Sequence, residues 1–150
     1  MAFTSGFHAA KRFKLGTEKR VDGNAFVYLA GVASTAIGSW VTFDEAGATL
    51  LLDSDGVAAQ GRVGIAMSAS VAAKFGWYQV YGSASGLALT AFADNGIVHQ
   101  SATAGSVDDA EVTSAISLVH GAWGRSAVNE TTFLATFELN YPWVSIGVID

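Results

Sequence analysis

Cysteine is absent from the 150-residue sequence, and charged residues are scarce at 14% of the chain. The missing cysteine excludes disulfides, thiol nucleophiles and thiolate metal sites. No apolar run reaches the roughly 18 residues that a membrane-spanning helix needs, since the nearest candidate, 25–37, is interrupted by Gly31, Ser34 and Thr35. We therefore expect a chain without covalent cross-links and without a membrane partner.

Apolar residues are abundant instead. They make up 51% of the chain, and the mean hydropathy of +0.36 is high for a soluble monomer. The length is typical of one domain. Because the apolar excess has no membrane to enter, we expect it in contacts between copies of the chain, which predicts a homo-oligomer. The first residues lack the order of a secretory signal, so we expect assembly in a cytoplasm.

Short apolar runs with a period near two recur along the chain, and glycine separates most of them. They occupy residues 25–32, 39–43, 48–53, 61–68, 76–82, 87–93, 111–121, 131–139 and 143–149. The pattern predicts a mainly β fold, a small Gly-punctuated antiparallel β-barrel or sandwich over residues 18–150. We expect residues 82–86 to form the turn of a hairpin and Pro142 to stand where a strand begins.

The N-terminal segment differs in charge from the rest of the chain. Residues 1–20 hold five of the eight basic residues and one acid, about +4, whereas residues 21–150 hold three bases and twelve acids, about −9. Residues 1–17 show no regular period, and they predict an extended N-terminal arm that becomes ordered on a partner; the alternative is that it packs on its own domain. The predicted contact residues of the arm are Phe3, Phe7, His8, Lys11, Arg12, Phe13 and Lys14.

Patterns that would indicate catalysis or metal binding are weak. The serines of residues 82–86 do not have the G-x-S-x-G spacing, and no Gly-rich phosphate loop occurs. The acidic stretches at 53–56 and 108–111 lack the full calcium-loop pattern, and His8, His99 and His120 are isolated. We expect no enzyme activity, no cofactor and no metal. A sequence pI of about 5.0 also argues against a nucleic-acid partner.

The stretch 74–89 carries three aromatic residues within five positions. In an extended strand Trp77 and Tyr81 share one face, and Tyr78 lies on the other. Aromatic residues on both faces are typical of a strand that is packed on both sides. We predict that one face is core and the other is a subunit seam built from Trp77, Tyr78 and Tyr81, and the pattern does not decide which ring lies on which side.

Four pieces of the chain, 14–45, 61–84, 92–110 and 135–144, resemble the small head-decoration (capsid cement) proteins of tailed bacteriophages. The likeness is carried by Gly64-Ile65-Ala66, by the stretch 76–82 and by Thr103-Ala104-Gly105. The resemblance implies a β-barrel-like virion protein on the capsid exterior, usually a homotrimer at three-fold positions, whose partner is the major capsid protein. The segment 110–140 is longer than in the smallest proteins of this family, so the sequence leaves open whether it adds an extra pair of strands.

Two other functions are compatible with the sequence. One is a carbohydrate- or cell-surface-binding β module of a virion, whose sugar-stacking rings would come from Trp40, Trp77, Trp123, Trp143 and neighbouring tyrosines. The other is a different head or tail structural subunit, which would form a ring instead of a trimer.

Overall fold

A computed structural model describes residues 8–54, 61–69, 71–110 and 118–144. All regular elements in these ranges are strands, as the glycine-separated runs predict. The strands are β1 (Glu18–Val21), β2 (Asn24–Ala30), β3 (Trp40–Phe43), β4 (Thr49–Leu51), β5 (Gly61–Ala66), β6 (Phe75–Leu87), β7 (Ile97–Gln100), β8 (Val107–Asp108), β9 (Leu118–Gly124) and β10 (Leu134–Val144).

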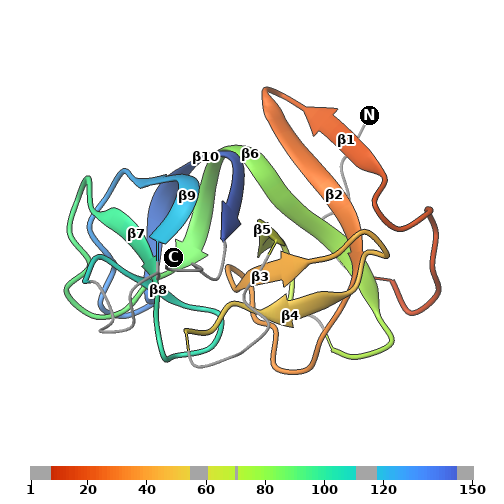
Figure 1. The fold of residues 1–150 in the computed structure, drawn as a ribbon, viewed down its shortest axis with the longest axis horizontal. Coiled ribbons are helices and arrows are strands. Elements are labelled where there is room, and N and C mark those ends of the chain that lie inside the picture. The colour runs from red at the N-terminus through yellow and green to blue at the C-terminus, as the bar shows by residue number, and fades with distance from the viewer. Residues whose placement is uncertain (1–7, 55–60, 70, 111–117, 145–150) are drawn as a thin grey trace, which may run out of the picture.

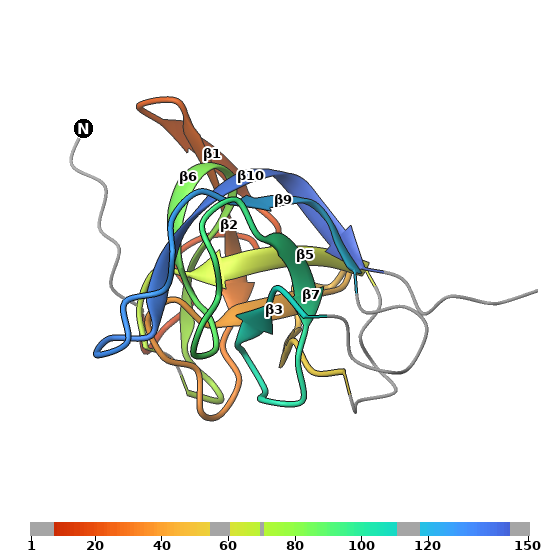
Figure 2. The ribbon, with the colours of Figure 1, turned by 90° about the vertical axis from the view of Figure 1, so that its left-hand side faces the viewer.

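The ten strands form one antiparallel sheet (Figure 1). Its order is β1-β2-β6-β5-β10-β9-β7-β8, with β3 attached to β5 and β4 to β3. Figure 2 shows β9 and β10 on one side of β5 and β3 on the other. The prediction of a mainly β, antiparallel fold is confirmed. The sheet is not closed into a barrel, because β1 and β8 end the strand order without pairing with each other.

The long strand β6 corrects the predicted hairpin. Residues 82–86 do not turn, since Ser83, Ala84 and Ser85 pair with β10. The two glycines of the stretch are needed within the strand itself, one for its backbone conformation and the other for close packing. Gly82 has φ +96°, and a Cβ on Gly86 would lie 2.7 Å from Nε1 of Trp40. Small residues therefore allow the strand to bend and pack closely, and the return strand predicted at 87–93 is reduced to a single bridge at its start.

Strand β10 also differs from the expectation for its proline. Pro142 does not begin the strand but lies near its end, where the register with β9 shifts between Leu139 and Trp143. Tyr141, immediately before it, has φ +47°. A proline inside a strand is tolerated at such an irregularity because no ladder hydrogen bond from its nitrogen is required there.

The core is divided into three apolar clusters by the sheet. The largest contains Trp40 and Phe137, whose rings meet edge to face with centroids 4.8 Å apart. A second includes Val27 and Tyr78, and a third is formed by Phe26, Tyr28 and Trp77. Strand β2 and residues 76–80 of β6 thus bury both of their faces, so these stretches lack the polar alternation of a one-sided strand, whereas Ser83 and Ser85 in the second half of β6 are exposed.

Candidate functional site

Residues 8–17 lie back on the chain's own sheet, beside β2 and β6. The backbones of His8 and Phe75 exchange two hydrogen bonds, of 2.6 and 3.0 Å, and Gly16 donates to the carbonyl of Tyr28 at 2.8 Å. For these residues the structure has the alternative arrangement, in which the segment packs on its own domain. Phe3 and Phe7 lie outside the described residues.

The segment covers the third cluster with an aromatic ring. Phe13 lies with its centroid 5.2 Å from that of Tyr28 and 5.3 Å from that of Trp77. Phe13 itself remains 42% exposed, whereas Tyr28 and Trp77 are buried. Leu15 packs against the same cluster. The segment is therefore a half-exposed cover, with one side on the domain and the other in solvent.

His8 is fixed by a polar contact at the edge of this cover. Its Nδ1 lies 2.9 Å from the hydroxyl of Tyr28, which also accepts a hydrogen bond from the backbone nitrogen of Arg12 at 3.2 Å. Burial lowers the pKa of His8, and the positive charge of Arg12 lowers it further. Burial and the nearby charge of Arg12 therefore both favour the neutral imidazole.

The basic side chains of the segment remain open to solvent. Lys11, Arg12 and Lys14 are all exposed. A hollow of about 380 Å³ lies beside residues 14–17, and Asp44 and Glu45 contribute acidic groups to its wall. Of the seven predicted arm residues, the structure thus buries His8, half-covers Phe13 and exposes the three cations.

The three predicted seam residues do not share one environment. Trp77 is 3% exposed and Tyr78 is 1% exposed, and both are buried by residues of this chain. Trp77 belongs to the third cluster and Tyr78 to the second, which lie on opposite faces of β6. Tyr81 alone keeps partial exposure, and it packs against the cluster of Tyr78 instead of sharing a face with Trp77 as expected, because the pairing with β2 shifts register between Gln79 and Tyr81. Of these three residues, Tyr81 is accessible on the surface of the single chain for contact with another subunit, whereas Trp77 and Tyr78 are not.

A second polar cluster joins segments that are far apart in the sequence. The hydroxyl of Tyr141 accepts a hydrogen bond from Arg20 and donates one of 2.8 Å to Glu18. The hydrogen bond to Glu18 is the main cause that raises the pKa of Tyr141. The Tyr81 ring lies 5.5 Å from that of Tyr141, below the Arg20 guanidinium. Sequence reasoning missed this cluster because more than 120 positions separate β1 from the end of β10.

The acidic stretches do not gather into a metal site within the described ranges. No group of three or more His, Asp or Glu side chains there could hold a metal ion. Asp109 instead accepts a hydrogen bond of 2.8 Å from the backbone of Ala93, and Glu111 and residues 55–56 lie outside those ranges. In the same part of the chain, no helix is long and apolar enough to cross a membrane.

Known proteins were compared with this chain in three ways. No family model, no curated protein and no solved structure matches it.

Proposed function

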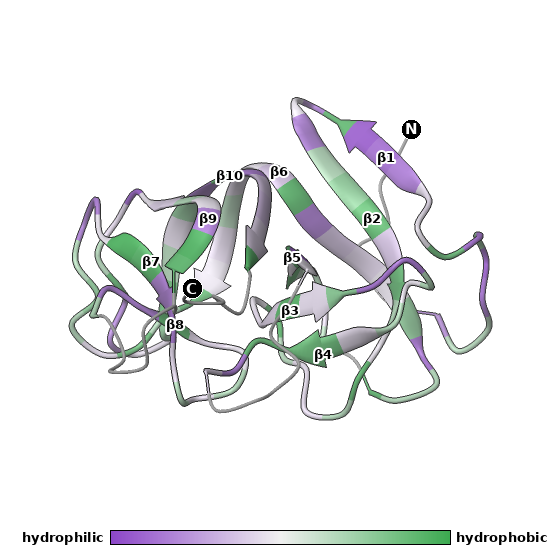
Figure 3. Cartoon of the chain, in the orientation of Figure 1, coloured by the Kyte–Doolittle hydropathy of each residue, from purple (hydrophilic) through white to green (hydrophobic). Residues whose placement is uncertain are grey.

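We propose that the chain is a non-enzymatic structural protein of a phage virion, which binds the capsid exterior as a trimer and stabilises the head. The observation that carries the proposal is the exposed row of cations at Lys11, Arg12 and Lys14, on a segment that is anchored to an otherwise acidic domain. Figure 3 shows that the hydrophilic character continues into β1, beside the more apolar β2. The partner is the major capsid protein.

Charge complementarity supports this mode of binding. The domain carries an excess of acids, so a cationic segment is the part of the chain best suited to an acidic protein surface. Three copies in a trimer would present three such segments together, and linked binding of this kind raises avidity by about 10²–10⁴ over one contact. A trimer at a three-fold capsid position can make the same contact with each of the three surrounding capsid subunits.

The test separates the charges of the segment from its role as a cover. Deleting residues 1–17 would expose Tyr28 and Trp77, whereas the triple variant Lys11→Glu, Arg12→Glu and Lys14→Glu keeps Phe13 in place. We expect this variant to stay trimeric and to lose binding to undecorated capsids in a co-sedimentation assay. Binding of the unchanged protein should weaken with added salt, since screening acts over about 10 Å at 0.1 M.

The matched control is Lys74→Glu, a charge reversal on the domain outside the segment. It should bind capsids as the unchanged protein does. Equal binding by the triple variant would contradict the role of the segment, and a monomeric mass of the isolated protein would contradict the trimer.

A further inference from the structure

The outward face of the β6, β10 and β9 region carries polar and aromatic side chains above a floor of small residues. The register places Glu138 of β10 between Trp123 of β9 and Ser83 of β6, and it places Asn140 beside Tyr81. Because Ser83 and its neighbour Gly82 are small, the surface is hollowed there. A groove of about 400 Å³ is lined by these residues.

Trp123 forms an exposed aromatic wall of this groove. Its side chain is 44% exposed, whereas Trp40 and Trp77 are buried in the core. An indole in solvent forgoes the stabilisation that burying its large apolar area would give. An exposed tryptophan beside a groove is therefore suited to a ligand that has a flat apolar face.

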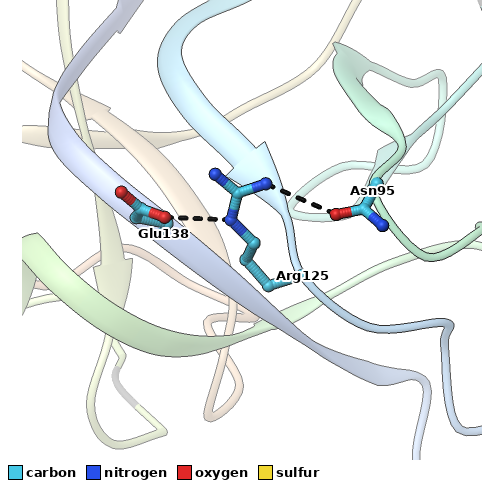
Figure 4. Close-up of polar contacts among 3 residues, drawn as sticks. All are labelled: Asn95, Arg125 and Glu138. Atoms are coloured by element: carbon cyan, nitrogen blue, oxygen red, sulfur yellow. Dashed lines mark hydrogen bonds and ion pairs between the residues drawn. The ribbon is translucent and has the colours of Figure 1, made fainter.

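An exposed ion pair lies next to this ring. Arg125 donates from Nε to Glu138 at 2.9 Å and from Nη1 to Oδ1 of Asn95 at 3.4 Å, as Figure 4 shows. The two charges neutralise each other, so the groove does not select for an anion or for a cation. The second oxygen of Glu138 and the amide of Asn140 add acceptors and a donor along the groove.

The groove is not suited to a peptide that binds as an extra strand. Residues Phe137, Glu138 and Leu139 of β10 pair with β6 on one side and with β9 on the other. Their backbone groups are already used by the sheet, so a ligand over them can be bound only by side chains. Recognition in the groove therefore depends on ring stacking and on side-chain hydrogen bonds.

We propose that this groove binds a neutral sugar of a glycan. The C–H face of a pyranose ring is flat and apolar and would stack on Trp123. Its hydroxyls both donate and accept, which matches the carboxylate of Glu138, the guanidinium of Arg125 and the amide of Asn140. The groove thus combines one aromatic wall with side-chain donors and acceptors that suit the hydroxyl groups of a sugar.

The experiment uses the whole folded protein on an array of neutral and sialylated oligosaccharides, followed by NMR titration with a neutral oligosaccharide that binds. We expect neutral glycans to bind and the indole N–H signal of Trp123 to shift. Trp123→Ala should weaken binding about tenfold or more, because the variant removes the stack together with its buried area. The matched control is Trp143→Ala, since Trp143 is equally exposed at 46% but stacks on His120 outside the groove.

Three results would overturn the proposal: no neutral glycan binds, only sialylated glycans bind, or binding by Trp123→Ala equals that of the unchanged protein. The titration tests the contact between the sugar and Trp123 without a variant. An indole signal of Trp123 that does not shift when sugar binds would also contradict the proposal. Capsid binding by Trp123→Ala should stay unchanged, so failure of the glycan site and failure of the capsid role are distinguishable.

Discussion

The attachment of the N-terminal segment should depend on one hydroxyl group. Tyr28→Phe removes the oxygen that lies 2.9 Å from His8 Nδ1 and accepts from the backbone nitrogen of Arg12 at 3.2 Å. The ring itself stays, so its contacts with Phe13 and Trp77 remain. The variant therefore tests the polar contacts of the segment separately from its aromatic packing.

The magnitude follows from the two hydrogen bonds that this hydroxyl makes. Each hydrogen bond contributes about 0.5–1.5 kcal/mol, so two contribute about 1–3 kcal/mol to the closed state, in which the segment lies on the sheet beside β2 and β6. The segment can open without unfolding the sheet, and amide hydrogen exchange measures such local opening. The amide of His8, which donates to the carbonyl of Phe75, should lose protection by roughly 5- to 150-fold at a factor of ten per 1.4 kcal/mol.

Two comparisons decide the outcome. Tyr81→Phe removes a hydroxyl on the same sheet outside the segment and should leave the protection of His8 unchanged. Amides in the centre of β6 should be unaffected in both variants. Unchanged protection of His8 in Tyr28→Phe would refute the reasoning that this hydroxyl holds the segment in place.

Three further predictions concern acid, packing and ionisation. His8 has a lowered pKa in the folded state, so the attachment of the segment is fully stable above the ordinary pKa of 6.5 and loses stability as the pH falls below it. The protection of the His8 amide gives the free energy of opening. A value that stays constant between pH 7 and 5 would contradict this prediction. Gly86→Ala should lower the thermal midpoint, because overpacking against Trp40 costs about 1–3 kcal/mol, and an unchanged midpoint would show that the ring yields freely. Glu18→Ala, which removes the acceptor, should lower the pKa of Tyr141 in a spectrophotometric titration, and an unchanged value would exclude the hydrogen bond as its cause.

The strands were predictable where apolar runs end at glycines. The predicted runs 25–32, 39–43, 48–53 and 61–68 contain or overlap β2 to β5, because burial on both faces leaves a continuous apolar signal. The stretch 82–86 was not predictable from local pattern. Gly and Ser are typical of turns, but here Gly86 allows close approach to Trp40 and the two serines lie on the exposed face of a long strand.

The candidate sites were predictable in part. The aromatic residues of β6 indicated packing on both faces, and Tyr78 and Trp77 do lie in different clusters of this chain, while the subunit seam stays a prediction. The cover that Phe13 forms, the Arg20–Tyr141 contact and the groove beside Trp123 could not be found from spacing. Each joins strands that only the topology brings together, so the register of the sheet had to be known first.

Strand β10 has a consequence for the order in which the protein can be completed during synthesis. It pairs with β5, β6 and β9, so parts of all three remain without a neighbour until residues 134–144 have left the ribosome. About 50 residues separate the end of β6 from the start of β10, which at about 5–20 residues per second is a delay of several seconds. During that delay the edge of β6 that later pairs with β10 is unpaired, and unpaired strand edges associate with other chains. Translation products that stop before residue 134 should therefore aggregate, whereas the complete strand closes three edges in one step.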